Sequence, residues 1–312
     1  MSSVQVRPFR RDDREQLTKL VNAHVQAVVP GASVSVNTVL SQLERAPGEF
    51  IVDPWVAERV TLVAEQRRRV VAAAHLLRYR AGEDVGESYR DAGEIGWLLY
   101  WPQATYWPDS AVAAQALMAA CLAQLGRWGV ARWYADGALP APGVYGVPAQ
   151  WPHVRALYEQ AGFVHEGRSE VVLLASVDEL PGPSQAPMDG LAVRRAVGVN
   201  GTRLSACLGE QVAGYVEVET NLAAGGRLGQ LDGWADIGGL QVSEPYRGRG
   251  VATWLVGQAA DWLRLARVDR LLDYTWVEHH DCLALLQRLG FRELTRTARG
   301  WVNRSGPASA VG

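Results

Sequence analysis

Residues 242–252 combine glycines and arginines in a spacing that suits the binding of an anion. They read Val-Ser-Glu-Pro-Tyr-Arg-Gly-Arg-Gly-Val-Ala. Gly248 and Gly250 permit positive φ angles and a close approach of the backbone to a ligand. Arg247 and Arg249 add positive charge beside them. This chemistry favours a phosphate or a pyrophosphate group.

The flanking segments place this stretch between a strand and a helix. Before it runs Asp236-Ile-Gly-Gly-Leu-Gln, an apolar segment of strand length. After it, apolar residues recur at helical spacing from Val251 to Ala266. The amides of a first helical turn lack intrahelical partners and carry the positive end of the helix dipole, so they favour an anion.

A tight turn without a ligand is the simplest alternative interpretation of two glycines at a helix start. The stretch matches neither of two common phosphate-binding patterns. No Gly-Lys-Ser/Thr follows it, which excludes a P-loop, and no Gly-x-Gly-x-x-Gly occurs in it, which excludes a dinucleotide fingerprint.

The segment Arg247-Gly-Arg-Gly-Val-Ala252 resembles the Arg/Gln-x-x-Gly-x-Gly/Ala acyl-CoA motif of the GNAT N-acetyltransferases. Val242 and Tyr246 stand where that family has its strand-end valine and an aromatic residue. Leu285-Leu-Gln-Arg-Leu-Gly-Phe291 resembles the helix-Gly-Phe segment that closes the GNAT core. The resemblance covers the last third of the chain and implies acetyl-CoA as the cofactor.

The two halves of the chain resemble each other in three places that follow the same order. The paired segments are 6–8 with 193–195, 94–100 with 236–242, and 157–163 with 285–291. This repeat favours an α/β (α+β) fold of two tandem GNAT-like domains, each with a central mixed β-sheet flanked by helices.

Composition marks the expected domain limits. Residues 181–190 contain three prolines and two glycines and are predicted to be the linker. Residues 1–180 then form a degenerate GNAT-like domain that lacks the acyl-CoA pyrophosphate loop. Residues 191–303 form the GNAT domain with the acyl-CoA motif, and we expect a disordered tail at 304–312.

The halves differ at the residues that carry chemistry. After Tyr100 the first half has no Gly-rich Arg pattern, and Asp109 or Ser110 is expected to cap the next helix. A carboxylate there would repel a phosphate. The first half keeps Tyr158, where GNATs often hold the tyrosine that protonates the CoA thiolate, whereas Leu286 stands at that place in the second half.

The second half is also shortened. Only a few residues separate its first strand, 191–197, from its hairpin, 203–219, whereas the first half has helical patterns at 12–28 and 36–43 on the same connection. In GNATs those helices wall the acceptor pocket. We therefore infer that acceptor recognition falls partly to the first half.

The resemblance implies direct attack of an amine on the thioester, which needs a base and an oxyanion donor. Asp236 is the base candidate because many GNATs carry a strand carboxylate at that place, six residues before Val242. A solvated carboxylate without a role is the alternative. Glu217 and Glu219 are further candidates. Tyr274 or His279 is expected to replace the missing acid, unless the thiolate leaves unprotonated.

The expected site therefore has a catalytic set and a cofactor-binding set. Residues 240–242 are expected to pair with the pantetheine, and the amide near Val242 to polarise the thioester carbonyl. The catalytic set is Asp236, Tyr274 and Glu217. The cofactor-binding set is Leu240, Gln241, Val242, Arg247, Gly248, Arg249, Gly250, Val251, Ala252 and His279.

Composition narrows the function classes. The formal net charge of −2 gives no support to a nucleic-acid partner, and therefore little to aminoacyl transfer from tRNA. No apolar run is long enough to span a membrane. Three cysteines lie far apart, which indicates a reducing compartment, here the cytoplasm, without a disulfide framework or zinc site. For residues 279–281, His-His-Asp, we expect no metal because no third ligand has suitable spacing.

We therefore predict an acetyl-CoA-dependent N-acetyltransferase that acts by direct transfer on a small-molecule amine or a peptide acceptor. The alternative is a non-catalytic CoA-binding protein or a structural pseudo-acetyltransferase. The many tryptophans between positions 55 and 151 are expected to fill the core, with a minority lining an apolar or cationic acceptor pocket. Neither the acceptor nor the oligomeric state follows from the sequence.

Overall fold

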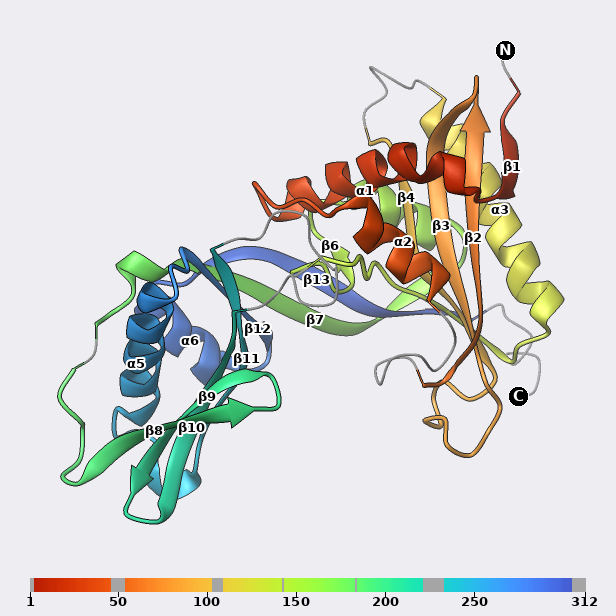
Figure 1. Ribbon diagram of the computed structural model, residues 1–312. Coiled ribbons are helices and arrows are strands. Elements are labelled where there is room, and N and C mark those ends of the chain that lie inside the picture. The colour runs from red at the N-terminus through yellow and green to blue at the C-terminus, as the bar shows by residue number, and fades with distance from the viewer. Residues whose placement is uncertain are drawn as a thin grey trace. The chain divides into compact units, whose positions relative to one another are not determined.

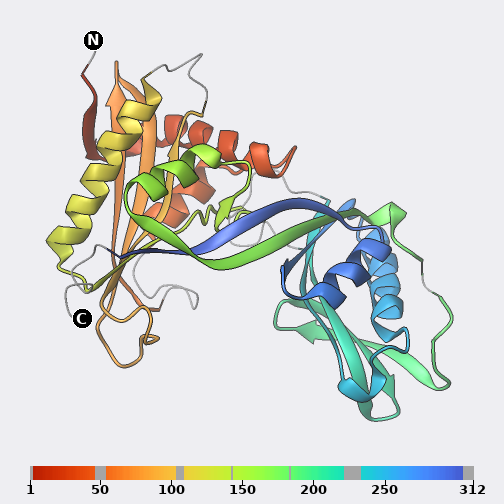
Figure 2. The same cartoon turned by 180° about the vertical axis from the view of Figure 1, so that it is seen from behind.

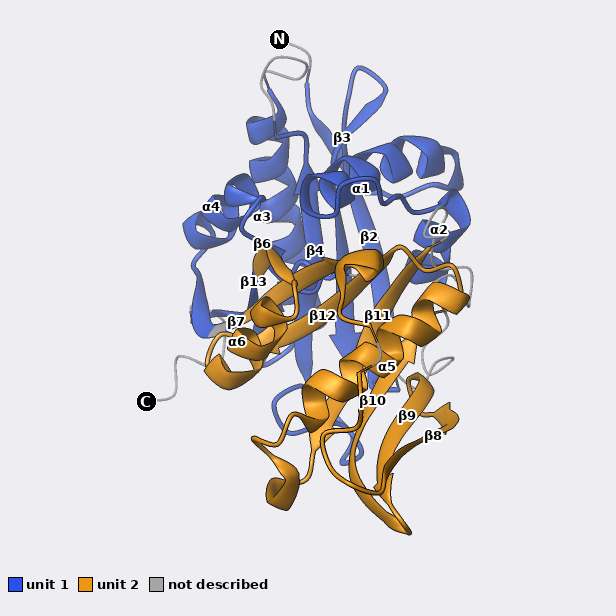
Figure 3. Ribbon diagram, turned by 90° about the vertical axis from the view of Figure 1, so that its left-hand side faces the viewer, with its two compact units in different colours: residues 1–169, 226–230, 297–312 blue, residues 170–225, 231–296 orange. Residues whose placement is uncertain are grey.

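A computed structural model describes most of the chain (Figure 1), and the described residues form two compact units (Figure 3). The described ranges are 3–45, 54–102, 109–141, 143–182, 184–220 and 233–304. Within them, unit 1 comprises residues 3–169 and 297–304, and unit 2 comprises residues 170–220 and 233–296. No helix in these ranges is long and apolar enough to cross a membrane.

Unit 1 is a mixed sheet with helices on both faces. Its elements are β1 (Gln5–Pro8), η1 (Arg11–Asp13), α1 (Arg14–Val28), α2 (Val36–Glu44), β2 (Val56–Gln66), β3 (Arg69–Tyr79), β4 (Ala92–Tyr100), α3 (Ser110–Trp128), β5 (Arg132–Ala135), β6 (Val147–Pro148) and α4 (Pro152–Gln160). Strands β1 to β4 are antiparallel neighbours, and β5 runs parallel to β4. Helices α1 and α2 cover one face and α3 covers the other (Figure 2).

Unit 2 has a similar sheet with fewer helices. It begins within β7 (Phe163–Ser176), which η2 (Val177–Glu179) follows. Its remaining elements are β8 (Leu191–Gly198), β9 (Gly201–Leu208), β10 (Gln211–Glu219), β11 (Trp234–Val242), η3 (Glu244–Tyr246), α5 (Val251–Leu265), β12 (Arg270–Trp276) and α6 (His280–Arg288). Strands β8 to β11 are antiparallel neighbours, β12 is parallel to β11, and β7 is antiparallel to β12.

Local sequence explains most of these elements. The apolar stripe that predicts a helix over 12–28 is buried in α1, including Leu17, Leu20 and Val21. The β2–β3 hairpin turns at Arg67 and Arg68, both at positive φ, as in a tight two-residue hairpin turn. In unit 2, apolar α5 residues pack on apolar residues of β10 and β11 to make the core.

The fold confirms the predicted internal repeat. The two units even share a β-bulge at the same strand position. Between β3 and β4 the register shifts so that Gly96 has no partner residue, and between β10 and β11 the same shift occurs at Gly238. In each case the bulge lies two residues after a carboxylate, Glu94 or Asp236. A shared bulge in register is a property of the whole sheet and identifies the two units as copies of one fold.

The limits of the units differ from the expected domain limits at two long strands. Residues 170–176 of β7 pair with β12 in unit 2. The last strand, β13 (Arg292–Asn303), begins in unit 2, and its residues 297–302 pair with β5 and β6 of unit 1. These are long-range pairings that composition does not reveal. Of the expected tail, residues 305–312 lie outside the described residues.

The expected shortening of the second half is confirmed. In unit 1 both α1 and α2 lie between the first two strands, whereas in unit 2 only Val199 and Asn200 separate β8 from β9. Among the described residues, no helix of unit 2 therefore corresponds to α1 or α2.

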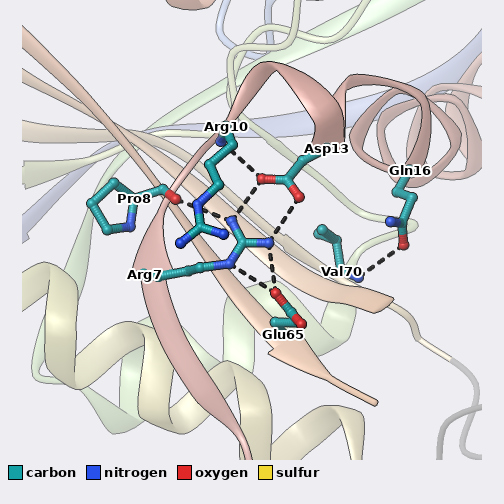
Figure 4. A network of polar contacts seen from close by, with 7 residues as sticks. All are labelled: Arg7, Pro8, Arg10, Asp13, Gln16, Glu65 and Val70. Atoms are coloured by element: carbon teal, nitrogen blue, oxygen red, sulfur yellow. Dashed lines mark hydrogen bonds and ion pairs between the residues drawn. The ribbon is translucent and has the colours of Figure 1, made fainter. Parts of the chain in front are cut away.

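The first strand of unit 1 is held by a buried ion network around Arg7 (Figure 4). Its Nε donates to Glu65 on β2 at 2.8 Å, and its two terminal nitrogens donate to Asp13 at 2.7 and 2.8 Å. The side chains of Arg7 and Asp13 are 10% and 8% exposed. The hydrogen bond from Arg7 holds the pKa of Asp13 below its usual value, so Asp13 stays ionised. The network ties β1 and the start of α1 to β2.

We predict that Arg7→Met lowers the stability of unit 1 by about 3 kcal/mol, because it leaves two largely buried carboxylates without their cation. Urea unfolding followed by circular dichroism measures this change. Arg11→Met is the matched control, since Arg11 pairs with Glu44 at the surface and its loss should leave the midpoint unchanged. Equal midpoints for both variants would contradict the role given to Arg7.

Candidate functional site

Strands β11 and β12 of unit 2 separate partway along their length. They pair in parallel over residues 234–236 only, and from Ile237 to Val242 the partner of β11 is β10. The bulge at Gly238 lies where the two strands part. Beyond this point, the edge of β11 that faces away from β10 is free of the β12 ladder. An extended chain with amide groups, such as pantetheine, can pair with such an edge.

The glycine-rich turn leads from this edge directly into a helix N-terminus. Gly248 and Gly250 both adopt positive φ, 72° and 81°, as expected from the sequence. Gly250 is the N-cap of α5, and no side chain caps the helix there. The first intrahelical bond runs from the Trp254 amide to the Gly250 carbonyl, 3.0 Å. The amides of residues 251–253 are therefore left for a ligand.

The turn has room for a phosphate group. A Cβ built on Gly248 would meet no atom within 4 Å, and residues 247–250 are all exposed. Arg247 donates from Nε to the Val242 carbonyl at 3.1 Å, which ties the turn to the end of β11. Arg249 is exposed beside it. Open backbone amides, a helix dipole and two arginines together fit a pyrophosphate.

The segment after η2 supports α5 from its outer side, which sequence reasoning missed. The Trp254 indole donates to the Ser184 carbonyl at 3.1 Å, and a Cβ on Gly250 would lie 3.5 Å from Pro187. Arg264 donates to the carbonyls of Val177 and Leu180 at 2.8 and 2.6 Å. The expected linker is thus part of the frame that fixes the helix. Its irregular backbone gave no signal of this packing.

The three expected catalytic residues lie on one face of the unit 2 sheet. Side chains alternate along a strand, and Val216, Ala235 and Leu271 belong to the core that α5 covers. Glu217, Asp236 and Tyr274 have the opposite parity on the same three strands. The structure therefore places all three on the face away from α5.

Asp236 is partly buried, at the point where β11 and β12 separate. Burial, with a smaller contribution from the charge of Glu219, raises the pKa of Asp236 to about 6. A carboxylate with a raised pKa holds a proton more tightly than an exposed one, which suits a general base near neutral pH.

Asp273 on β12 is a buried carboxylate that the sequence analysis missed, and it shares the parity of Leu271, on the face that α5 covers. It is 6% exposed, and burial raises its pKa to about 7, with a further contribution from the charge of Asp236. Its carboxylate accepts a hydrogen bond from the Tyr274 amide at 2.7 Å. The available signal was a single acidic residue within the apolar run 271–276.

Glu217 is engaged in protein contacts. Its side chain is 2% exposed, accepts from the Arg203 Nε, and accepts from the Asn200 amide at 3.2 Å. Burial alone would raise the pKa of Glu217, but the hydrogen bond and the charge of Arg203 and the nearby amides lower it. It is therefore a weaker base candidate than Asp236.

The expected substitutes for the acid lie near the start of α6. The Tyr274 hydroxyl oxygen is buried. His279 is the N-cap residue of α6, but its side chain does not cap the helix and instead lies 3.4 Å from the Thr275 hydroxyl. Leu286, at the place where GNATs often hold a tyrosine, is fully buried in the core. Burial raises the pKa of Cys282, which leaves its thiol protonated.

Unit 1 closes the corresponding edge with its own chain. After β5, the Asp136 amide donates to the Ile95 carbonyl at 2.8 Å and the Ala138 amide donates to the Gly96 carbonyl at 3.1 Å. Asp109 is the N-cap residue of α3, and its carboxylate accepts from Gln66 at 3.0 Å. The Tyr158 hydroxyl is bound to the Asp136 carbonyl at 2.8 Å. The bonds from residues 136 and 138 thus occupy the strand edge that corresponds to the open edge of β11 in unit 2.

Comparisons with known proteins agree with this geometry. Residues 178–291 match the family model of the acetyltransferase (GNAT) family. None of the curated proteins matches the chain by sequence.

Three solved structures have a similar fold. A tandem GNAT protein from the clavulanic acid biosynthesis pathway has a TM-score of 0.63 and 15% identity, over 96% of this chain and 98% of its own. A GCN5-related N-acetyltransferase from Sphaerobacter thermophilus has a TM-score of 0.62 and 15% identity, over 97% and 96%. The glucosamine N-acetyltransferase region of a fungal multi-domain β-N-acetylglucosaminidase has a TM-score of 0.66 and 16% identity; this chain is covered to 96% but spans 38% of that protein.

Proposed function

We propose that the chain is an acetyltransferase of the GNAT family whose unit 2 binds acetyl-CoA and transfers the acetyl group directly to an amine; the family match of residues 178–291 and the tandem GNAT fold support this. The observation that carries this proposal is that one continuous segment offers both a strand edge and a helix N-terminus to a ligand. The open edge of β11 leads through two positive-φ glycines into the uncapped N-terminus of α5. The same segment therefore offers a strand edge to pantetheine and free amides to pyrophosphate.

Each part of the cofactor has residues that suit it. The backbone of residues 240–242 pairs with the pantetheine amides. The amides of residues 248–252 and the positive charge of Arg247 and Arg249 hold the pyrophosphate. His279, at the start of α6, lies beside the cofactor. Bound acetyl-CoA supplies a thioester, whose acetyl group becomes an amide on the acceptor while CoA leaves as a thiol.

Asp236 takes the proton that the attacking ammonium must lose. Its pKa of about 6 leaves it mostly ionised at neutral pH, while its partial burial makes the carboxylate a stronger base than an exposed one. The neighbouring charge that raises the pKa of Asp236 is that of Glu219, whereas the charge of Asp236 raises the pKa of the buried Asp273. Glu217 fixes the β9–β10 hairpin through Arg203.

The proton for the departing thiolate does not come from residue 286, since a buried leucine stands there. Tyr274, on the same sheet face as Asp236, is the candidate donor. A thiolate is also a stable leaving group near neutral pH, so the reaction does not depend strictly on an acid.

Thermal unfolding with and without acetyl-CoA tests the location of the cofactor. The wild-type protein should gain about 2.7 kcal/mol of stability at a hundredfold excess of ligand over Kd. Gly250→Asp should abolish the gain, because it places a negative charge at the pyrophosphate amides. Gly250→Asn is the matched control, since asparagine has the same shape without the charge and tolerates positive φ. It should retain a gain.

Two results would overturn this assignment. One is a wild-type protein whose stability acetyl-CoA leaves unchanged. The other is an equal gain in Gly250→Asp and Gly250→Asn, which would place the ligand elsewhere. Asp109→Asn in unit 1 should not alter the gain, because unit 1 closes its own edge with residues 136–138.

The pH dependence of transfer tests Asp236 as the base. With any accepted amine, kcat/KM should fall as the pH drops through about 6, because protonated Asp236 cannot accept a proton. Asp236→Asn should lower kcat by roughly 10² to 10⁴ and remove this limb of the profile. Asp261→Asn, an exposed acid on α5, is the control and should keep both. An unchanged limb near pH 6 in Asp236→Asn would exclude Asp236 as the base.

A further inference from the structure

Unit 1 contains an acidic and aromatic cluster, centred on the buried Glu94, that the proposed acetyl transfer does not use. We call it the Tyr89 cluster; it consists of Trp55, Tyr79, Tyr89, Glu94, Tyr134 and Asp136. Glu94 lies on β4, at the register position that Asp236 occupies on β11. Asp136 follows β5 directly. The whole cluster lies in unit 1, so it is independent of the α5 turn.

Each of the two carboxylates accepts a hydrogen bond from its own unit. Glu94 is 8% exposed and accepts a hydrogen bond from the Tyr79 hydroxyl. Asp136 accepts from the Gly137 amide at 2.8 Å. Burial and then the charge of Asp136 raise the pKa of Glu94 to about 7, and burial raises the pKa of Asp136 to about 6. The charge of Arg299 opposes both shifts without cancelling them.

Aromatic rings gather around Tyr89, which lies in the loop between β3 and β4. The Tyr89 ring lies 5.0 Å from the Tyr79 ring, 5.5 Å from the Tyr134 ring and 6.1 Å from the Trp55 ring, measured between centroids. The charge of Glu94 is the largest cause that raises the pKa of Tyr89 to about 12, and burial is the next.

Tyr89 is also the exposed member of the cluster, at 37%. The loop that carries it is tied to β5, because Tyr134 and Arg132 donate to the Ser88 carbonyl at 2.7 and 3.0 Å. The cluster therefore meets solvent at the Tyr89 ring, and this is the side from which a ligand would approach.

We propose that the Tyr89 cluster is a binding site for an organic ammonium ion. A buried carboxylate beside a half-buried one, with one arginine nearby, favours a further cation, and the faces of aromatic rings attract one that is weakly hydrated. An anion is excluded by the same carboxylates. A metal ion fits less well, because the described residues contain no group of three or more His, Cys, Asp or Glu that could hold one.

The cation is expected to displace a proton from the site. The titratable and charged groups around Glu94 are Tyr79, Tyr89, Tyr134, Asp136, Tyr158 and Arg299. Near pH 7 Glu94 is partly protonated. An ammonium ion stabilises the ionised form, so binding lowers the pKa of Glu94 and releases protons to the buffer.

Calorimetric titration of the full chain with tetramethylammonium and with methylammonium tests the site, with sodium chloride matching the ionic strength. Measured near pH 7, the heat should differ between phosphate and MOPS buffers because protons are released. Glu94→Gln should weaken binding at least tenfold and remove the buffer dependence. Tyr89→Leu removes one exposed ring and should weaken binding about two- to fivefold. The Tyr89→Leu variant still tests the site if Glu94→Gln fails to fold.

Asp261→Asn is the control, since it removes an exposed acid on α5 of unit 2 and should leave this affinity unaltered. Acetyl-CoA should still stabilise the Glu94→Gln variant as it stabilises the wild type. The experiments therefore distinguish an error in the cation site from an error in the cofactor site. Absence of heat with both ammonium ions would overturn the proposal. Equal affinities in the wild type, Glu94→Gln and Tyr89→Leu would do the same.

Discussion

The proposed cofactor site depends on where β11 stops pairing with β12. Three residue pairs, from Trp234 to Asp236, hold the two strands in parallel, and the bulge at Gly238 then turns the β11 ladder toward β10 alone. If the pairing continued, the backbone of residues 239–242 would be satisfied within the sheet. Because it ends, the same backbone is available to a ligand, and the base candidate stands at the point of separation.

The two units show two outcomes of this constraint. In unit 1 the strands β4 and β5 also pair for a few residues only, but the chain then folds back so that residues 136–138 bond to the free edge. In unit 2 the edge stays open and a glycine turn follows it. A backbone group must be satisfied by the protein, by water or by a ligand. Unit 1 satisfies its edge internally and has two early helices, whereas the described residues of unit 2 have no counterpart of those helices and leave the edge open.

Sequence reasoning was most successful where local chemistry decides structure. The positive φ of Gly248 and Gly250, the start of α5 and the repeat of the two units all follow from residue types and spacing. The crossing of β13 into unit 1 did not follow, because the pairing of Trp301 with Ala135 joins residues far apart in the chain.

The site residues show the same limit. Asp236 stood out because it precedes a recognisable motif at a fixed distance. Asp273 was missed because its proximity to Asp236 arises from the parallel pairing of two strands that are separated by a helix. The packing of Ser184 and Pro187 on α5 was missed for a similar reason, since an irregular segment has no periodicity to reveal its contacts.

The most direct test of the account is amide hydrogen exchange of the full chain with and without acetyl-CoA. The account predicts added protection in peptides that cover residues 238–254, and unchanged exchange in peptides that cover residues 94–100 and 109–116 of unit 1. Protection of those unit 1 peptides, with none at residues 238–254, would contradict it and would place the cofactor in the other unit.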